Sequence, residues 1–344
     1  MRDKYFVFIF VSILLFFTLS YLVTKDKEIS NSERRHLTTF KDVKHYNITD
    51  SFYSKELEKY ALDQVVFRDQ WRYIKAKVAF DIFNKSDDNQ FYLEDGHILK
   101  KEQKLDEERL KVFLNKANGI IQQYAHSKSK MLIIPGKEYY ASAYSAFDYE
   151  KAMDLINSQF KGEFLDVRDQ LALNDYYYSD PHLKQEAYFK LFPINQANLK
   201  KYTYQPFYGT YSSQFAYQLV SDQLNYFENP CSIEANYLET PEFKEVYNLD
   251  KLNNNDAYSV FLNGATPFVH LKNKDNKDGQ TLLVFRDSFG SSLVPLLVDT
   301  YQDIYVVDLR YMNLTDAERL IDKEIDEILL VYGMNSINEG TVIK

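Results

Sequence analysis

The feature that most constrains the fold is a stretch, residues 282–295, in which a short apolar segment turns abruptly and continues as a helix. Residues 282–285 have the pattern of a buried strand, the turn falls at Ser288, and residues 290–298 have the pattern of a buried helix. A strand that breaks into a helix at a serine exposes the hydroxyl group and directs free backbone N–H groups of the first helical turn to the same place. This geometry is typical of an activated nucleophile beside an oxyanion site. The alternative is that Ser288 only caps the helix, since serine is a favoured N-cap.

The chain around this stretch alternates between short apolar segments and amphipathic ones. Such alternation predicts an α/β fold, with a parallel sheet covered by helices on both faces. Ligands of such sheets bind beyond the carboxyl ends of the strands, and Ser288 lies at such an end. The Tyr-, Asn- and Pro-rich residues 201–273 have short strands at best and are expected as an insertion over the sheet. Strands are expected at residues 131–134, 164–167, 281–285, 303–307 and 327–332, and helices at about 149–160, 181–199 and 315–322.

The residues before this region are predicted to be mainly helical, with helices at about 51–63, 68–83 and 105–125. A hairpin is expected at 91–99, because a Glu-Asp-Gly turn separates two apolar triplets. The second helix carries apolar residues at helical spacing, which predicts a buried stripe. The stripe consists of Trp71, Ile74, Val78 and Ile82.

The N-terminus begins with a tail, residues 1–4, and continues as an apolar run, residues 5–23. The run is long enough to span a bilayer, exceeds the usual apolar core of a cleaved signal peptide, and is followed by no small-residue cleavage site. We therefore expect an uncleaved anchor, with a cleaved signal peptide as the alternative. Residues 24–50 are expected as a polar stalk and residues 51–344 as the folded domain. The orientation is left open by basic residues on both sides of the run: Arg2, Lys4, Lys25, Lys27, Arg34 and Arg35.

Composition excludes several classes of function. The formal net charge is −9 and no basic stripe is present, which argues against nucleic acid as a partner. Cys231 is the only cysteine, so no intramolecular disulfide or cysteine-based metal cluster is possible, and the six histidines lack paired-ligand spacing. We expect neither a metal nor a cofactor. The 29 Tyr and 25 Phe residues are attributed to composition bias and core packing, although a few of the tyrosines suit a sugar-binding groove.

A second informative stretch is Ser-Asp-Pro-His at residues 179–182. Proline suits the first turn of a helix and Asp180 suits the position before it, so one reading is a simple helix cap with His182 exposed in the first turn. In the other reading, the Asp180 carboxylate contacts the imidazole, fixes its tautomer and stabilises its charged form. A histidine with a near-neutral pKa is the usual proton acceptor for a serine hydroxyl.

Several stretches, in order along the chain, resemble the DHHW family, within the wider group of SGNH-like proteins that includes the extracytoplasmic alginate O-acetylation proteins. The resemblance runs from about residue 32 to the C-terminus, and its most specific parts are Arg-Asp-Ser-Phe at 286–289 and Asp-Leu-Arg-Tyr at 308–311. It implies an SGNH-like (flavodoxin-like) sheet with permuted motif order, in which the Asp and His precede the Ser. Carried over by position, it implies Ser288 as nucleophile, His182 as base and Asp180 as the residue that orients the base. The other matching stretches are residues 33–37, 63–68, 135–137, 179–182 and 207–211.

The chain departs from the family in the segment that gives the family its name. That segment reads Thr-Asp-His-His-Trp-Thr in the family and Ser-Asp-Pro-His-Leu-Lys at residues 179–184 here. The two catalytic positions remain, whereas the first His, the Trp and the final Thr are replaced. The departure therefore concerns substrate contacts more than proton chemistry.

Weaker candidates complete the predicted site. Arg286 stands where SGNH proteins usually have Gly, as in the DHHW branch, and Asp287 follows it. Arg286 and Arg310 are candidates for binding an anionic group, with pairing to local acids as the alternative. Asn263 and Gly264 are candidates for the oxyanion site, with a turn as the alternative.

The leading hypothesis is a membrane-anchored, extracytoplasmic O-acyltransferase or esterase that acts on a cell-surface polysaccharide, with acetyl as the acyl group. The resemblance implies both the extracytoplasmic placement and a multi-pass membrane acyltransferase as a partner. The rival hypothesis is a non-catalytic glycan-binding or envelope-assembly protein that keeps the fold.

Overall fold

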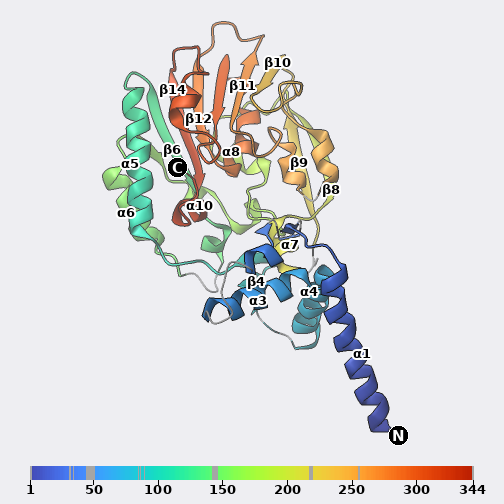
Figure 1. Cartoon of the computed structure of the whole chain (residues 1–344). Coiled ribbons are helices and arrows are strands. Elements are labelled where there is room, and N and C mark those ends of the chain that lie inside the picture. The colour runs from blue at the N-terminus through green and yellow to red at the C-terminus, as the bar shows by residue number, and fades with distance from the viewer. Residues whose placement is uncertain are drawn as a thin grey trace. The chain divides into compact units, whose positions relative to one another are not determined.

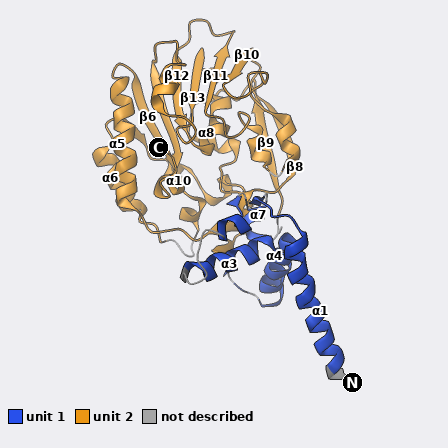
Figure 2. Ribbon diagram, in the orientation of Figure 1, with its two compact units in different colours: residues 1–88, 212–218 blue, residues 89–211, 219–344 orange. Residues whose placement is uncertain are grey.

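A computed structural model describes residues 2–30, 32–33, 35–43, 51–83, 85, 87–88, 90–141, 146–216, 220–254 and 256–342. The chain divides into two compact units: residues 1–88 with 212–218, and residues 89–211 with 219–344 (Figure 2). Arg34 and residues 44–50 of the expected stalk lie outside the described part of the chain. The same is true of residues 217–219 and 255 in the expected insertion.

The first unit is helical. Its first helix, α1 (Arg2–Val23), is apolar and long enough over Lys4–Val23 to cross a membrane, a property it shares with signal sequences (Figure 1). Its other elements are β1 (Ile29–Ser30), β2 (Arg35–His36), α2 (Phe40–Val43), α3 (Ser51–Gln64), α4 (Arg68–Lys77), the π-helical η1 (Val78–Ile82) and β3 (Asp87–Asp88).

Residues 24–43, expected as part of a stalk, are hydrogen-bonded to α3. The guanidinium of Arg35 donates to both carboxylate oxygens of Asp63, at 2.5 and 3.1 Å, and the Thr38 N–H donates to the same carboxylate at 2.9 Å. Burial alone would raise the pKa of Asp63, but these hydrogen bonds hold it below its usual value. Four described residues of the matching stretches 33–37 and 63–68 thus form one ion-paired cluster: Glu33, Arg35, Asp63 and Arg68.

The helix expected at 68–83 is split into α4 and η1, and its apolar stripe is not buried. Trp71 and Ile74 are each 47% exposed and Ile82 is 66% exposed, so the prediction of a buried stripe is wrong. The residues of this segment that are buried are the small ones, Ala76 and Ala79. Helical spacing of apolar residues in a sequence does not distinguish a stripe that packs inside the protein from one that faces outward.

The second unit is built on a seven-stranded sheet. The strand order is β10-β11-β13-β12-β14-β6-β7, and the five strands from β13 to β7 are parallel. This confirms the predicted α/β fold. The strands are β6 (Lys128–Ile134), β7 (Glu163–Leu165), β10 (Ile233–Tyr237), β11 (Phe268–Asn273), β12 (Thr281–Arg286), β13 (Asp303–Val307) and β14 (Glu327–Gly333).

Alternate residues of the central strands enter two separate cores. In β12, Leu283 and Phe285 belong to the core that lies under α5 (Glu107–Gln123), α6 (Tyr149–Gln159), α9 (Leu314–Glu318) and α10 (Met334–Asn338). Leu282 and Val284 belong to the core on the other face, together with α8 (Ser288–Leu293). Strands that are apolar on both faces require this double cover, because each face must be removed from water.

The region 201–273 contributes more to the sheet than predicted. β8 (Lys200–Phe207) and β9 (Asp222–Glu228) form a separate antiparallel pair, and α7 (Thr210–Phe215) lies between them in sequence. However, β10 and β11 extend the main sheet. β11 pairs antiparallel with β13, and β10 pairs antiparallel with β11. The expectation of an insertion with short strands at best is therefore wrong for these two strands.

The helix expected at 181–199 is also absent. Residue Leu183 pairs with Tyr176 in an isolated β-bridge, and only a 3₁₀ helix, η5 (Gln185–Lys190), follows. Pro193, which has no N–H to donate, ends any continuation.

The expected hairpin is present as β4 (Phe91–Glu94) and β5 (His97–Lys100). The remaining 3₁₀ helices are η2 (Lys137–Tyr140), η3 (Arg168–Gln170), η4 (Leu173–Asp175), η6 (Leu249–Asn253), η7 (Ala257–Val260) and η8 (Val294–Leu296).

Candidate active site

The turn between β12 and α8 presents Ser288 at the carboxyl end of a central strand. Asp287 is the N-cap of α8, and its carboxylate accepts the Phe289 N–H at 3.0 Å and the Gly333 N–H at 2.9 Å. The second bond ties the turn to the end of β14. Asp287 is fully buried, whereas Ser288 is partly exposed. Asp287 thus fixes the turn, and it leaves the serine accessible.

The structure brings Ser288, His182 and Asp180 together. The Nε2 of His182 lies 2.7 Å from the Oγ of Ser288, across 106 positions of the chain. The Nδ1 of His182 lies 2.5 Å from Oδ1 of Asp180. Because a carboxylate only accepts, Nδ1 carries the proton, and Nε2 is left to accept from the serine hydroxyl.

Asp180 is buried and held from several sides. Its Oδ1 also accepts the His182 N–H at 3.1 Å, and its Oδ2 accepts the Thr210 N–H at 2.7 Å. A Cβ on Gly209 would lie 2.2 Å from the Cβ of Asp180, so only glycine permits this approach of the backbone. The Gly209 N–H donates to the Ser179 Oγ at 2.9 Å. The matching stretch 207–211 therefore positions the carboxylate.

Two buried charges hold the backbone of residues 177–180. The Nζ of Lys137 donates to the carbonyl oxygens of Tyr177, Tyr178 and Asp180 at 3.0, 3.2 and 3.0 Å. Burial lowers the pKa of this lysine from 10.5 to about 8. The carboxylate of Asp222 accepts the N–H groups of Tyr178 and Ser179, each at 2.8 Å, and burial raises its pKa.

The ring of Tyr258 stacks on the imidazole of His182, with centroids 4.0 Å apart and planes 11° apart. Its hydroxyl group lies 2.7 Å from the Ser292 Oγ and donates to the Ser288 carbonyl oxygen at 3.3 Å. Burial raises the pKa of Tyr258 well above 10, so the hydroxyl remains protonated. The electron-rich face of an aromatic ring attracts a positive charge placed against it.

Sequence reasoning did not assign roles to Lys137, Gly209, Asp222 or Tyr258. Lys137 and Gly209 lie in matching stretches, 135–137 and 207–211, which was the only available signal. Asp222 and Tyr258 lie in the region read as an insertion, and their roles depend on contacts far apart in sequence.

The two arginines proposed as substrate contacts are engaged elsewhere. Arg286 is 1% exposed, and its guanidinium donates to the Ser291 Oγ at 2.9 Å and to the Gly264 carbonyl oxygen at 3.1 Å. Arg310 donates to the buried carboxylate of Asp308 at 2.6 and 2.9 Å. The structure gives Arg286 the alternative role, pairing inside the protein. Arg310 is partly exposed and borders a cavity with Leu238 and Tyr311.

Asn263 and Gly264 lie in a turn and have left-handed backbone conformations, with φ of 57° and 81°. The side chain of Asn263 is hydrogen-bonded to Asn248 and Thr240, at 2.8 and 3.1 Å. These contacts correspond to the turn that the sequence left as an alternative. The part of the chain that the structure describes contains no group of three or more His, Cys, Asp or Glu residues that could hold a metal ion.

The oxyanion donors differ from expectation. The N–H of Phe289 is taken by the Asp287 side chain, and the N–H of Gly290 donates to the Asp287 carbonyl oxygen at 3.2 Å. The first helical N–H, that of Ser288 itself, has no acceptor within its own helix. The expectation that the whole first turn offers free N–H groups is therefore wrong for two of them.

Comparisons with known proteins place the chain in a class. The fold resembles that of a DHHW family protein from Eubacterium siraeum DSM 15702, with 18% identity, a TM-score of 0.61, and coverage of 74% of this chain and 95% of that one. It also resembles Bacillus cereus PatB1 with a sulfonyl adduct, with 14% identity, a TM-score of 0.58, and coverage of 74% and 100%. The search of curated proteins found no match. The chain has the SGNH-like α/β fold predicted from its sequence.

A family model matches part of the chain. The model of the family described as DHHW protein matches residues 173–307, which include Asp180, His182 and Ser288. This match confirms the predicted resemblance to the DHHW family over those residues, which are less than half of the chain.

Proposed function

We propose that this protein is an O-acyltransferase that moves an acetyl group to a hydroxyl group of a cell-surface polysaccharide, with Ser288 as the nucleophile. Hydrolysis of the same ester is its esterase reaction. The proposal is carried by one observation, the continuous hydrogen-bonded series from the Asp180 carboxylate through His182 to the Ser288 Oγ, at 2.5 and 2.7 Å. A nucleophile, a base in reach of it and a group that orients the base are the parts that serine catalysis needs.

In the first half-reaction, Nε2 of His182 takes the proton of Ser288 while Oγ forms a bond to the carbonyl carbon of the donor. Asp180 stabilises the imidazolium, and the stacked ring of Tyr258 adds to that stabilisation. The bond from carbon to the leaving oxygen then breaks, and the imidazolium gives its proton to that oxygen. The product is an acetyl ester on Ser288.

In the second half-reaction, Nε2 takes a proton from a sugar hydroxyl, whose oxygen attacks the ester carbon. The bond from that carbon to Oγ breaks, and the proton passes to Oγ, which restores Ser288. The N–H of Ser288 is the backbone donor left to face the oxyanion, since its neighbours are engaged with Asp287. Water in place of the sugar gives the esterase reaction.

The membrane context supports an envelope substrate. The apolar α1 suits an anchor that keeps the second unit near the surface polymer. The choice of acetyl, the extracytoplasmic placement and a multi-pass acyltransferase as donor partner come from the family resemblance.

The second candidate is a non-catalytic glycan-binding or assembly protein. It is favoured by the shortage of oxyanion donors, because two of the N–H groups beside Ser288 are already bonded to Asp287. A site with one backbone donor stabilises a tetrahedral intermediate less than a site with several.

A direct test uses the full chain in detergent, with p-nitrophenyl acetate as donor and a phenylsulfonyl fluoride as a trapping reagent. Wild type is expected to release p-nitrophenol and to gain one sulfonyl group on Ser288 by mass spectrometry. Ser288→Ala should lose both, with activity lower by about 10³-fold. Ser158→Ala, which removes an exposed hydroxyl on α6, is the matched control and should behave as wild type.

The outcomes separate the two candidates. Equal p-nitrophenol release by Ser288→Ala would refute Ser288 as the nucleophile. Absence of both activity and sulfonyl adduct in the folded wild type would favour the non-catalytic candidate.

A further inference from the structure

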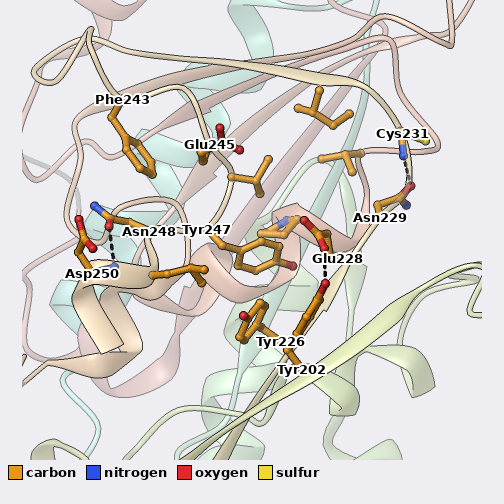
Figure 3. Close-up of a pocket in the computed structure, with 15 residues that line it drawn as sticks. Tyr202, Tyr226, Glu228, Asn229, Cys231, Phe243, Glu245, Tyr247, Asn248 and Asp250 are labelled. Atoms are coloured by element: carbon orange, nitrogen blue, oxygen red, sulfur yellow. Dashed lines mark hydrogen bonds between the residues drawn. The ribbon is translucent and has the colours of Figure 1, made fainter. Parts of the chain in front are cut away.

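The second unit contains a cavity of about 450 Å³ that the proposed reaction does not use (Figure 3). Its walls come from β8 and β9, from the loop after β9, from residues 243–250, and from Pro295 and Val298 beyond α8. A cavity of this size matches those that hold small ligands.

The chemistry of the walls is specific. Three tyrosine rings lie in series, with Tyr202 and Tyr226 stacked at 5.0 Å and Tyr226 and Tyr247 at 5.1 Å between centroids. Among the lining residues are three carboxylates, and none of the lining residues is Lys, Arg or His. These carboxylates are Glu228, Glu245 and Asp250, labelled in Figure 3.

This combination selects the charge of the ligand. The three acids of the lining outnumber the neighbouring Lys200, so the cavity repels an anionic sugar and attracts a cation. Aromatic faces bind ammonium groups and also pack against the apolar faces of sugar rings. The Tyr202 ring already lies 4.7 Å from the ammonium group of Lys200, which shows that the ring accepts such a group.

A buried side chain connects one lining residue of the cavity to the helix that begins at Ser288. The buried amide of Gln185 donates to the Ser292 carbonyl oxygen in α8 at 2.8 Å and to the Tyr247 hydroxyl at 3.2 Å. Pro295 follows Ser288 by seven positions, which is roughly 10 Å along a helix. A chain of a few sugar units is long enough to span that length.

We propose that this cavity is a glycan subsite that binds a sugar carrying a protonated amine. This inference rests on the proposed function. The subsite holds the acceptor polysaccharide while another sugar of the same polysaccharide reaches Ser288. The acceptor is then an amino-sugar polymer, and uronic acid polymers are excluded.

Calorimetric titration of the full chain in detergent with a glucosamine tetramer tests the subsite. Wild type and Ser288→Ala are expected to bind alike, so that failure of the catalytic proposal leaves this result unchanged. The double variant Glu245→Gln, Asp250→Asn should bind about tenfold more weakly. Glu242→Gln, an exposed acid outside the cavity, is the matched control and should bind as wild type.

Two comparison ligands complete the test. The N-acetylated tetramer, which lacks the positive charge, should bind more weakly than the amine, and a galacturonate tetramer should not bind. Equal binding of the amine and the N-acetylated tetramer, undiminished binding by the double variant, or binding of galacturonate would overturn the proposal.

A different observation carries a second inference, within the first unit. The start of the exposed apolar stripe of α4 and η1 lies next to α1, where the rings of Phe17 and Trp71 are 6.3 Å apart. A hydrogen bond from the Tyr21 hydroxyl to the Ala61 carbonyl oxygen, at 2.6 Å, joins α1 to α3. Phe17 precedes the end of α1 at Val23 by six positions, roughly 9 Å of helix. Trp71 therefore lies at the level of the last turns of the apolar helix.

We infer that this stripe lies in the interface of the bilayer that α1 crosses. Interfacial helices bury their apolar faces about 5–10 Å deep, and tryptophan is enriched at that depth. A bilayer also accounts for the exposure of several large apolar side chains on one unit, which water alone would disfavour. These side chains are Phe52, Leu62, Phe67, Trp71, Ile74, Ile82 and Phe83.

Trp71 is the only tryptophan, so its fluorescence reports on this stripe alone. In phosphatidylcholine–phosphatidylglycerol vesicles, lipids brominated near the headgroup should quench it more than lipids brominated deep in the acyl chain. Ile74→Ser with Ile82→Ser should reduce that quenching, while Val112→Ser, an exposed position on α5, should not. Quenching by aqueous iodide with no effect of brominated lipid would overturn the inference and leave a protein partner as the cover of the stripe.

Discussion

The ammonium group of Lys137 lies 3.0 Å from the carbonyl oxygen of Asp180, 43 positions further along the chain. The same group also donates to the carbonyl oxygens of Tyr177 and Tyr178, so that one buried lysine binds three carbonyl groups of a single loop. The loop that presents Asp180 and His182 is therefore held by the charge of Lys137 together with the loop's own bonds to Asp222 of β9 and Thr210 of α7.

This arrangement predicts how stability depends on pH. Since burial lowers the pKa of Lys137 from 10.5 to about 8, the unfolded chain binds the proton more tightly than the folded one. The cost of the buried charge is fully present below pH 8 and is relieved as the pH rises toward 10.5. Relative to Lys137→Met, the wild type should gain about 2 kcal/mol of unfolding free energy between pH 8 and 10.

Urea unfolding of both proteins, followed by circular dichroism, measures that difference. The comparison with Lys137→Met removes the contributions of tyrosines and other groups that titrate in the same range. A constant difference across this pH range would show that the lysine is not perturbed by burial.

Gly209→Ala should disable the site without unfolding the protein. The new methyl group would lie 2.2 Å from the Cβ of Asp180, so the carboxylate or the 209–210 backbone must move by about an ångström. Such a displacement should lower kcat for p-nitrophenyl acetate by about 10²-fold. Gly119→Ala, where the added Cβ meets nothing within 4 Å in the middle of α5, is the matched control. It should keep full activity and gain about 0.5–1 kcal/mol of stability. Full activity of Gly209→Ala would mean that Asp180 tolerates displacement.

Tyr258 should act on His182 through its ring more than through its hydroxyl. Tyr258→Phe keeps the stacked face at 4.0 Å and loses the hydroxyl contacts with the Ser292 Oγ and the Ser288 carbonyl oxygen, so kcat/KM should remain within about threefold of wild type. Tyr258→Leu removes the ring and should lower kcat/KM by about tenfold, because the imidazolium that forms during the reaction loses the electron-rich face that stabilises it.

Comparison of the two variants decides between two roles for Tyr258. If the stacked ring stabilises the imidazolium, Tyr258→Phe should stay close to wild type while Tyr258→Leu loses activity, and this is the outcome expected. Equal losses in the two variants would assign the effect to the hydroxyl group instead.

The sequence was most informative where patterns are local. The alternation of apolar segments predicted β6, β12, β13 and β14 because central parallel strands are apolar on both faces. The resemblance identified Asp180, His182 and Ser288, which the structure brings within hydrogen-bonding distance.

The predictions that failed concern segments whose structure depends on contacts between residues far apart in the sequence. The 179–182 segment has good helix-start residues, yet the bonds from Lys137 and Asp222 hold its neighbours in an irregular loop. The helical stripe beginning at Trp71 was recognised, but helical spacing alone does not reveal whether the partner of a stripe is protein or lipid. Tyr258 reaches His182 only through tertiary folding, so no local pattern marks it.

Substitution of Arg286 tests whether this residue has a structural role or binds the substrate. Its guanidinium is fully buried and joins Ser291 and Gly264, and its Nη1 lies 3.6 Å from the carboxylate of Asp308. Removing one partner of a buried charged network leaves the other polar groups unsatisfied, so Arg286→Met should lower the unfolding free energy by about 3–5 kcal/mol. Arg319→Met, at a side chain 73% exposed, should change it by less than about 0.5 kcal/mol.

Kinetics on the folded fraction of Arg286→Met separate the two roles. If Arg286 only holds the turn together, KM for p-nitrophenyl acetate and KM for an anionic acyl donor should change together. Neither donor would then contact this buried side chain. A selective rise of KM for the anionic donor would instead place the guanidinium at the substrate. We expect the first result, because both Nη atoms already have partners inside the protein.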